Sequence, residues 1–321
     1  RNKGPDEFAF GERVIGDTIT VTLGLDETTA GVVKLLMEEK IQFNVIDPLM
    51  DFEKYDLLII PDYGILNDEI HDKLKDFLKK GGKILLSYKA TFDDGEFSCP
   101  GIELEFVEES RYEVDYIRVL PKIGDGLPTN FDIAMYKPGL YVNCKGCEIL
   151  AKIREPYFRR TYRTFTSHMY APAAKDSRHP AIVLSQDGGV IYIYSPIFAA
   201  YYDYGYGYYR RLVRNCINLL MPNRLVKADA PTTSEVTLSR KENKMIIHLV
   251  NFQPARIGAH PEYMEDYYPA RSMKIRVRME EEPKKVFSAM TGKDLSCEFT
   301  NGYLEVTLQE PDVYEVIVAE F

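Results

Sequence analysis

The stretch Tyr55-Asp-Leu-Leu-Ile-Ile-Pro61, followed by Lys83-Ile-Leu-Leu-Ser87, decides the fold class. Both runs are short and apolar, which is typical of strands buried on both faces of a parallel sheet. A helix is predicted between them, because Asn67 suits an N-cap and Lys79-Lys-Gly81 suits a helix end. A strand, a helix and a strand in this order predict a right-handed crossover in an α/β sheet.

Other segments extend this pattern on both sides. Each further predicted strand is a short apolar run: Thr18–Leu23, Phe43–Asp47, Ala181–Leu184 and Val190–Tyr194. A helix through Val32 and Met37 and another over residues 209–220 complete the series. The alternation predicts a flavodoxin-like, doubly wound parallel sheet in an α/β domain over residues 1–225. Residues from about 90 to 180 are interpreted as an insertion with long loops.

The hydrophobic period changes to two after residue 226, and no helical pattern follows. Five predicted strands alternate apolar and polar residues, at 235–238, 245–250, 274–278, 304–308 and 314–318. Asn301-Gly302 is a signal for a two-residue hairpin turn. We therefore predict a second, smaller antiparallel β-sandwich domain over residues 226–321.

The composition predicts a folded chain and argues against two classes of partner. The chain is 45% hydrophobic and 28% charged, with 49 acidic and 40 basic residues and a net charge of -9. This balance offers no general attraction to nucleic acid or to an anionic membrane. We expect neither partner and a cytoplasmic location. Because residues 1–6 resemble a connector and Arg1 replaces an initiator Met, we also expect a fragment of a longer protein.

The ends of the predicted parallel strands are where ligands bind in open α/β sheets. Amidotransferases and related hydrolases place a nucleophile there, on a tight strand-to-helix turn. Here that turn reads Ser87, Tyr88 and Lys89, without Cys or flanking Gly, and the turn expected to carry a His-x-Glu reads Tyr194-Ser-Pro196. We expect a degenerate elbow and no catalytic residue. Gly24-Leu-Asp-Glu27 is not a phosphate loop, and no cofactor is expected.

Three other motifs give little indication of a functional site. His260-Pro-Glu262 is interpreted as a chance match in the longest loop of the β domain. Cys144-Lys-Gly-Cys147 has the spacing of a metal or redox pair, yet without a second pair we expect reduced loop thiols and no metal site. Cys216 falls on the apolar face of the last helix and is expected to be packed there.

Two aromatic segments are candidate binding surfaces. A loop over residues 155–172 gathers arginines, a histidine and several rings, and loops of this kind commonly bind something. A run of tyrosines after residue 200 favours a subunit interface over stacking on sugar rings. The candidate ligand or interface residues are Arg159, Arg160, Tyr162, Ser167, His168, Tyr202, Tyr204 and Tyr206.

The first domain resembles the β-galactosidase trimerisation-type domain, a degenerate relative of the class I glutamine amidotransferases. The likeness rests on Gln42-Phe-Asn-Val-Ile-Asp47, residues 55–62 and Gly81-Gly-Lys-Ile-Leu-Leu86. Further segments are similar to the domain that follows the catalytic barrel in bacterial α-L-fucosidase-like glycoside hydrolases. These are Glu155-Pro-Tyr-Phe158, Thr166-Ser-His168, Arg210-Arg-Leu-Val213 and Asn218-Leu-Leu-Met-Pro222.

The resemblance implies a parent enzyme whose barrel lies upstream of Arg1 and carries both catalytic carboxylates. This chain would then be a non-catalytic accessory region whose partners are its own barrel and identical subunits. Two alternatives stay open: a stand-alone hydrolase or amidotransferase-like enzyme that uses Ser87 or His168, and a carbohydrate-binding module. In an oligomer, Arg159, Arg160 or His168 could also complete the mouth of a barrel.

Overall fold

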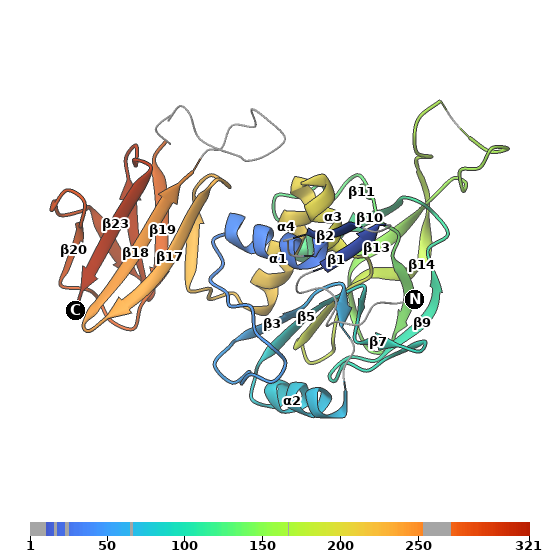
Figure 1. Cartoon of the computed structure of the whole chain (residues 1–321), viewed down its shortest axis with the longest axis horizontal. Coiled ribbons are helices and arrows are strands. Elements are labelled where there is room, and N and C mark those ends of the chain that lie inside the picture. The colour runs from blue at the N-terminus through green and yellow to red at the C-terminus, as the bar shows by residue number, and fades with distance from the viewer. Residues whose placement is uncertain (1–10, 16–17, 23–25, 65–66, 166, 253–270) are drawn as a thin grey trace. The chain divides into compact units, whose positions relative to one another are not determined.

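The computed structural model describes residues 11–15, 18–22, 26–64, 67–165, 167–252 and 271–321 (Figure 1). The chain divides into two compact units. The larger comprises residues 1–33 and 46–222, and the smaller comprises residues 34–45 and 223–321. Each unit is described separately below.

A seven-stranded mixed sheet forms the centre of the larger unit. Its strands, in spatial order, are β11 (Ile133–Met135), β10 (Asp115–Val119), β13 (Glu148–Pro156), β14 (Ala173–Leu184), β15 (Val190–Ile193), β5 (Lys83–Ser87) and β3 (Leu57–Ile60). The predicted parallel pairing is confirmed for β3, β5 and β15. It is wrong for β14, which contains the predicted strand Ala181–Leu184 and pairs antiparallel with β15. The strands β10, β11 and β13, which were not among the predicted strands of the sheet, are also antiparallel.

The antiparallel strands come from the region where long loops were expected. Irregular register along the β13–β14 pair breaks the period-two pattern that would have marked these strands in the sequence. Three short pairs accompany the sheet: β9 (Leu104–Glu109) with β12 (Leu140–Cys144), β4 (Tyr63–Gly64) with β6 (Lys89–Ala90), and β7 (Phe92–Asp93) with β8 (Glu96–Phe97). A short 3-10 turn, η2, spans Pro121–Ile123.

Two predicted strands near the N-terminus are not part of the sheet. Thr18–Thr22 forms β2, which pairs antiparallel with β1 (Gly11–Ile15). Residues 43–47 form no strand, and Val45 is 70% exposed, so this segment lacks the burial that a sheet strand would give it. Among the described strands, β3 therefore lies at one edge of the seven-stranded sheet.

The helices of the larger unit follow the sequence signals closely. Asn67 caps α2 (Asp68–Lys79) by accepting a hydrogen bond from the backbone of Ile70. In α4 (Gly207–Leu220) the predicted apolar stripe is buried, and Cys216 is packed within it as expected. The start of α1 (Glu27–Glu38) lies so close to α3 (Ile197–Tyr204) that a Cβ on Gly31 would meet the Phe198 carbonyl oxygen at 2.1 Å.

Cys144 and Cys147 are joined by a disulfide, so the expectation of two reduced thiols is wrong. Gly146 has a φ of 67° and turns the chain tightly between them. The two Cα atoms are consequently 5.8 Å apart, within the usual span of a disulfide. The cysteines at positions 99, 216 and 297 are free.

The smaller unit contains two four-stranded antiparallel sheets around one apolar core, as a sandwich requires. One sheet has β16 (Val226–Asp229), β19 (Met273–Arg278), β22 (Tyr303–Leu308) and β21 (Cys297–Thr300), and the other has β17 (Ser234–Lys241), β18 (Lys244–Asn251), β23 (Tyr314–Glu320) and β20 (Lys285–Ser288). The Asn301-Gly302 hairpin is confirmed, and both residues have the positive φ that its turn needs. His260 and Glu262 lie outside the described residues.

Residues 34–45 belong to this smaller unit. The Gln42 side chain forms two hydrogen bonds with the edge strand β17. Its amide nitrogen donates to the Val236 carbonyl, and its amide oxygen accepts from the backbone amide of Leu238. Lys40 is almost fully buried and donates to the Pro231 carbonyl at 2.6 Å. Within the described part of the chain, no helix has the length and apolar character needed to cross a membrane.

Candidate functional site

The turn after β5 contains a residue with a strained backbone, and none of its side chains is a free nucleophile. Tyr88 has a φ of 52°, a left-handed conformation that non-glycine residues adopt only when the surrounding structure holds them there. The Tyr88 amide donates to the Ile193 carbonyl at 2.8 Å, and the Tyr192 hydroxyl donates to the Tyr88 carbonyl at 3.0 Å. The strained turn is thus fixed by β15, and its strained residue carries a phenol and not a nucleophile.

The three residues of this turn are occupied by other contacts. Burial, with help from the charges of Glu109 and Asp62, raises the pKa of Tyr88 to about 12, so the phenol stays protonated at neutral pH. Lys89 forms an ion pair with Glu109 at 2.7 Å. Ser87 is fully buried and its hydroxyl donates to Asp62 at 2.7 Å, which leaves it closed to a substrate.

Asp62 is the most constrained charged residue at this edge of the sheet. It is fully buried, and its carboxylate accepts hydrogen bonds from the Ser87 hydroxyl, the Thr28 hydroxyl and the Ala199 amide. Burial raises its pKa to about 6, although the bonds from Ala199 and Ser87 oppose that rise.

The bond from Ala199 to Asp62 explains what this carboxylate does in the fold. Ala199 is the third residue of α3, and the N-cap residue Pro196 gives that helix no side-chain cap. The carboxylate of Asp62, which follows β3, supplies the missing hydrogen-bond acceptor. It also places a negative charge at the positive N-terminal end of α3. Asp62 therefore ties the ends of β3 and β5 to the start of α3.

A cluster of tyrosines lies around Tyr136, in the segment between β11 and β12. Its ring is 5.0 Å from Tyr204, 5.7 Å from Tyr206, 6.1 Å from Tyr170 and 6.4 Å from Tyr209, measured between ring centroids. The buried Tyr209 hydroxyl accepts from the Tyr136 amide at 2.8 Å and fixes the cluster to the core. We call these five rings the tyrosine cluster.

The tyrosine cluster unites two segments that the sequence presented separately. Tyr204 and Tyr206 come from the predicted aromatic run, and Tyr170 from the end of the predicted binding loop. Tyr202 and Tyr204 are about half exposed. Tyr136 was not among the candidates, because an isolated tyrosine in a region expected to be loop gives no signal of its central position.

Lys137 joins the neighbouring helices beside this cluster. Its ammonium group lies 2.6 Å from an Asp203 carboxylate oxygen and 3.2 Å from one of Glu27. Partial burial lowers the pKa of Lys137, but the hydrogen bonds and charges of Asp203 and Glu27 outweigh burial and raise it overall. The start of α1, the end of α3 and the segment after β11 are held together by this network.

Residues 157–169, which we call the arm, connect β13 and β14 and project away from the sheet (Figure 1). Thr161 and Thr164 pair with each other, so Tyr162 and Arg163 form the tip. The Arg163 guanidinium lies over the Tyr162 ring at 5.1 Å. The candidate residues Arg159, Arg160, Tyr162, Ser167 and His168 are all exposed here.

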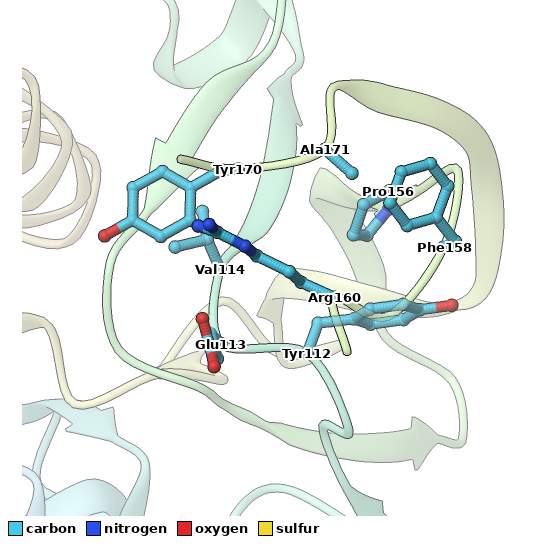
Figure 2. A pocket seen from close by; sticks show the side chains of 8 residues that line it. All are labelled: Tyr112, Glu113, Val114, Pro156, Phe158, Arg160, Tyr170 and Ala171. Carbon is cyan, nitrogen blue, oxygen red and sulfur yellow. The ribbon is translucent and has the colours of Figure 1, made fainter. Parts of the chain in front are cut away.

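A small pocket lies at the base of the arm (Figure 2). Its lining is Tyr112, Glu113, Val114, Pro156, Phe158, Arg160, Tyr170 and Ala171. Figure 2 shows the Arg160 side chain extending across the pocket, with its guanidinium beside Tyr170. Arg160 also donates to the Met169 carbonyl, so it braces the arm rather than offering an open anion site. Among the described residues, no group of His, Cys, Asp and Glu side chains is arranged to bind a metal ion.

Comparisons with known proteins agree with the resemblance found in the sequence. Residues 29–107 match the family model of the beta-galactosidase trimerisation domain. A search of curated proteins found no match. The resemblance to a region of glycoside hydrolases is thus confirmed for the part that the family model covers and, at the level of the fold, by solved structures.

Two solved structures illustrate the likeness in fold. Alpha-L-fucosidase isoenzyme 2 from Paenibacillus thiaminolyticus is 24% identical, with a TM-score of 0.86 over 94% of this chain and 46% of its own. A beta-galactosidase from Bacillus circulans sp. alkalophilus is 15% identical, with a TM-score of 0.59 over 91% of this chain and 37% of its own. The chain spans less than half the length of either protein.

Proposed function

We propose that this chain is a non-catalytic, subunit-assembly region of a glycoside hydrolase. The observation that carries the proposal is the match of residues 29–107 to a trimerisation domain. The elbow within that match holds a protonated Tyr88 and a buried, hydrogen-bonded Ser87, which supports a structural role. Identical subunits are the partners that this domain implies.

The same proposal includes the ancestry of the first domain and the boundaries of both domains. Three parallel strands and a left-handed residue after the middle one are the features that an ancestral amidotransferase-like domain would leave behind. We assign residues 1–225 to that domain, although residues 34–45 group with the smaller unit, and residues 226–321 to the sandwich. The cytoplasmic location stays a prediction.

The catalytic barrel is assigned to a part of the longer polypeptide that this chain does not contain. The fucosidase and the galactosidase of similar fold are both more than twice as long as the part that this chain matches. Glycoside hydrolysis needs two carboxyl groups at a set separation. The buried carboxylates Asp62 and Asp115 have structural partners instead, which supports placing the catalytic pair elsewhere.

Two assays on this chain test the proposal. We expect no release of aryl alcohol from aryl α-L-fucosides or aryl β-galactosides, and a molar mass in light scattering that is a multiple of 36.9 kDa. Hydrolysis that disappears in Ser87→Ala or His168→Ala would favour the stand-alone enzyme. A persistent monomer would contradict the assembly role.

A carbohydrate-binding module is the second candidate, because Tyr202 and Tyr204 expose about half of their surface and rings of this kind stack on sugars. Calorimetric titration with monosaccharides and oligosaccharides separates the two functions. Heat of binding that is lost in Tyr204→Ala would support the module, and flat titrations would support assembly alone.

A further inference from the structure

The arm displays side chains whose apolar surface is costly to leave in water. Tyr162 is 82% exposed, Tyr157 is 70% exposed and Phe165 is 68% exposed. Among the described residues, neither Arg159 nor Arg163 has a carboxylate partner. Exposed rings beside unpaired arginines are the residue types that dominate the centres of protein interfaces.

A strip of carboxylates with the opposite charge lies on the same unit. Its members are exposed and, within the described ranges, none of them forms an ion pair: Asp93, Asp94, Glu96, Glu103, Glu105 and Glu108. They belong to β7, β8, β9 and the turns beside these strands. We call this set the acidic strip.

A row of aromatic rings packs β7, β8 and β9, which carry most of the acidic strip, against the central sheet. Phe106 of β9 lies 5.0 Å from Phe92, Phe92 lies 4.9 Å from Phe97, and Phe97 lies 5.4 Å from Tyr192 of the central sheet. The strands that carry these carboxylates are therefore packed against the central sheet. An incoming cation would meet several negative charges that no ion pair of the described residues neutralises.

The arm and the acidic strip of one chain do not meet. Figure 1 shows the arm extending up and away from the sheet, while β7 and β9 lie well below the arm in this unit. A partner that offers a matching surface to both is a second copy of the same chain, since each copy carries one of each. Such a contact is head-to-tail, and a head-to-tail contact closes into a ring when the rotation allows.

We infer that the arm of one copy docks on the acidic strip of the next copy, with Arg159 and Arg163 facing the carboxylates at and just before the start of β9 and Tyr162 covered between them. The inference rests on the proposed assembly function and specifies its contact. A three-fold ring built from this contact uses every arm and every strip once, which agrees with a trimerisation domain.

Charge reversal on each side tests this pairing. The arm variant is Arg159→Glu with Arg163→Glu, the strip variant is Glu103→Lys with Glu105→Lys, and a third chain carries all four changes. A matched control for the arm variant, Arg240→Glu with Lys293→Glu, makes the same change in net charge as that variant at exposed positions of the smaller unit. Far-ultraviolet circular dichroism confirms that each variant is folded before its mass is measured.

The expected result is a specific pattern in sedimentation equilibrium. The arm and strip variants each dissociate toward 36.9 kDa, with an assembly constant weakened at least ~10-fold per pair of changes. The chain with all four changes and the control both assemble like wild type. Raising the salt concentration weakens wild-type assembly, because the contact is charged and partly exposed.

Three results would overturn the inference. If the arm and strip variants both assemble like wild type, the proposed contact is wrong, but the proposed assembly function is not contradicted. Loss of assembly in the arm variant alone would show that the arm binds a different surface. A wild-type chain that is monomeric would overturn both the contact and the proposed function.

Discussion

The buried carboxylate of Asp62 makes the stability of the larger unit depend on pH. Its pKa rises from 3.8 to about 6, chiefly because burial disfavours the charged form. Asp115 on β10 behaves alike: burial raises its pKa to about 6, and its Oδ2 atom has no hydrogen-bond partner. The folded chain therefore binds two protons more tightly than the unfolded chain does.

The sign and size of the effect follow from these values. A carboxyl whose pKa is raised on folding stabilises the fold below its ordinary pKa, and that stabilisation is lost as the pH rises through about 6. The full difference for one such carboxyl is about 3 kcal/mol, of which about 1.4 kcal/mol develops between about pH 7.5 and about pH 5. Replacing Asp62 by Asn removes this contribution and keeps an amide oxygen for the Ala199 amide.

Urea unfolding of wild type and Asp62→Asn at these two pH values measures the difference. We expect wild type to gain about 1.4 kcal/mol more than the variant when the pH is lowered. Asp72→Asn, an exposed position on α2, is the matched control and should follow wild type. Equal gains in wild type and Asp62→Asn would refute the argument that this carboxylate is held in a costly charged state.

Three further changes test the packing around the site. Gly31→Ala should destabilise the larger unit by ~2 kcal/mol or more in urea unfolding, because the new Cβ would collide with the Phe198 carbonyl between α1 and α3. Tyr136→Ala should cost ~2 kcal/mol or more by the same assay and increase proteolytic cleavage in the arm, since it removes the centre of the tyrosine cluster. Gly302→Ala should lower the stability of the smaller unit by ~1 kcal/mol, because its φ is 73°.

The sequence correctly predicted those helices and strands whose own residues determine their structure. The apolar runs at 57–60, 83–87 and 190–193 are the three parallel strands, and the Asn67 cap marks the start of α2. Phe43–Asp47 has the composition of a strand but little burial, and composition does not reveal whether a partner strand is beside it. Strands β9 and β12 were missed because a bulge and charged residues hide their alternation, and β14 was predicted only over its last four residues.

Only part of the candidate site could be predicted from the sequence. That Ser87 and Tyr88 do not have the residue types of a nucleophile elbow follows from the sequence alone. The role of Asp62 required knowing that α3 begins beside it, and the role of Tyr136 required knowing that residues far apart in the chain meet there. Such contacts depend on topology, which the period of a single segment does not encode.

The molar mass of this chain in solution tests the central claim most directly. The account predicts a stable assembly whose mass by sedimentation equilibrium is a whole multiple of 36.9 kDa, and three copies is the multiple that a trimerisation domain implies. A mass of 36.9 kDa at every concentration examined would contradict it.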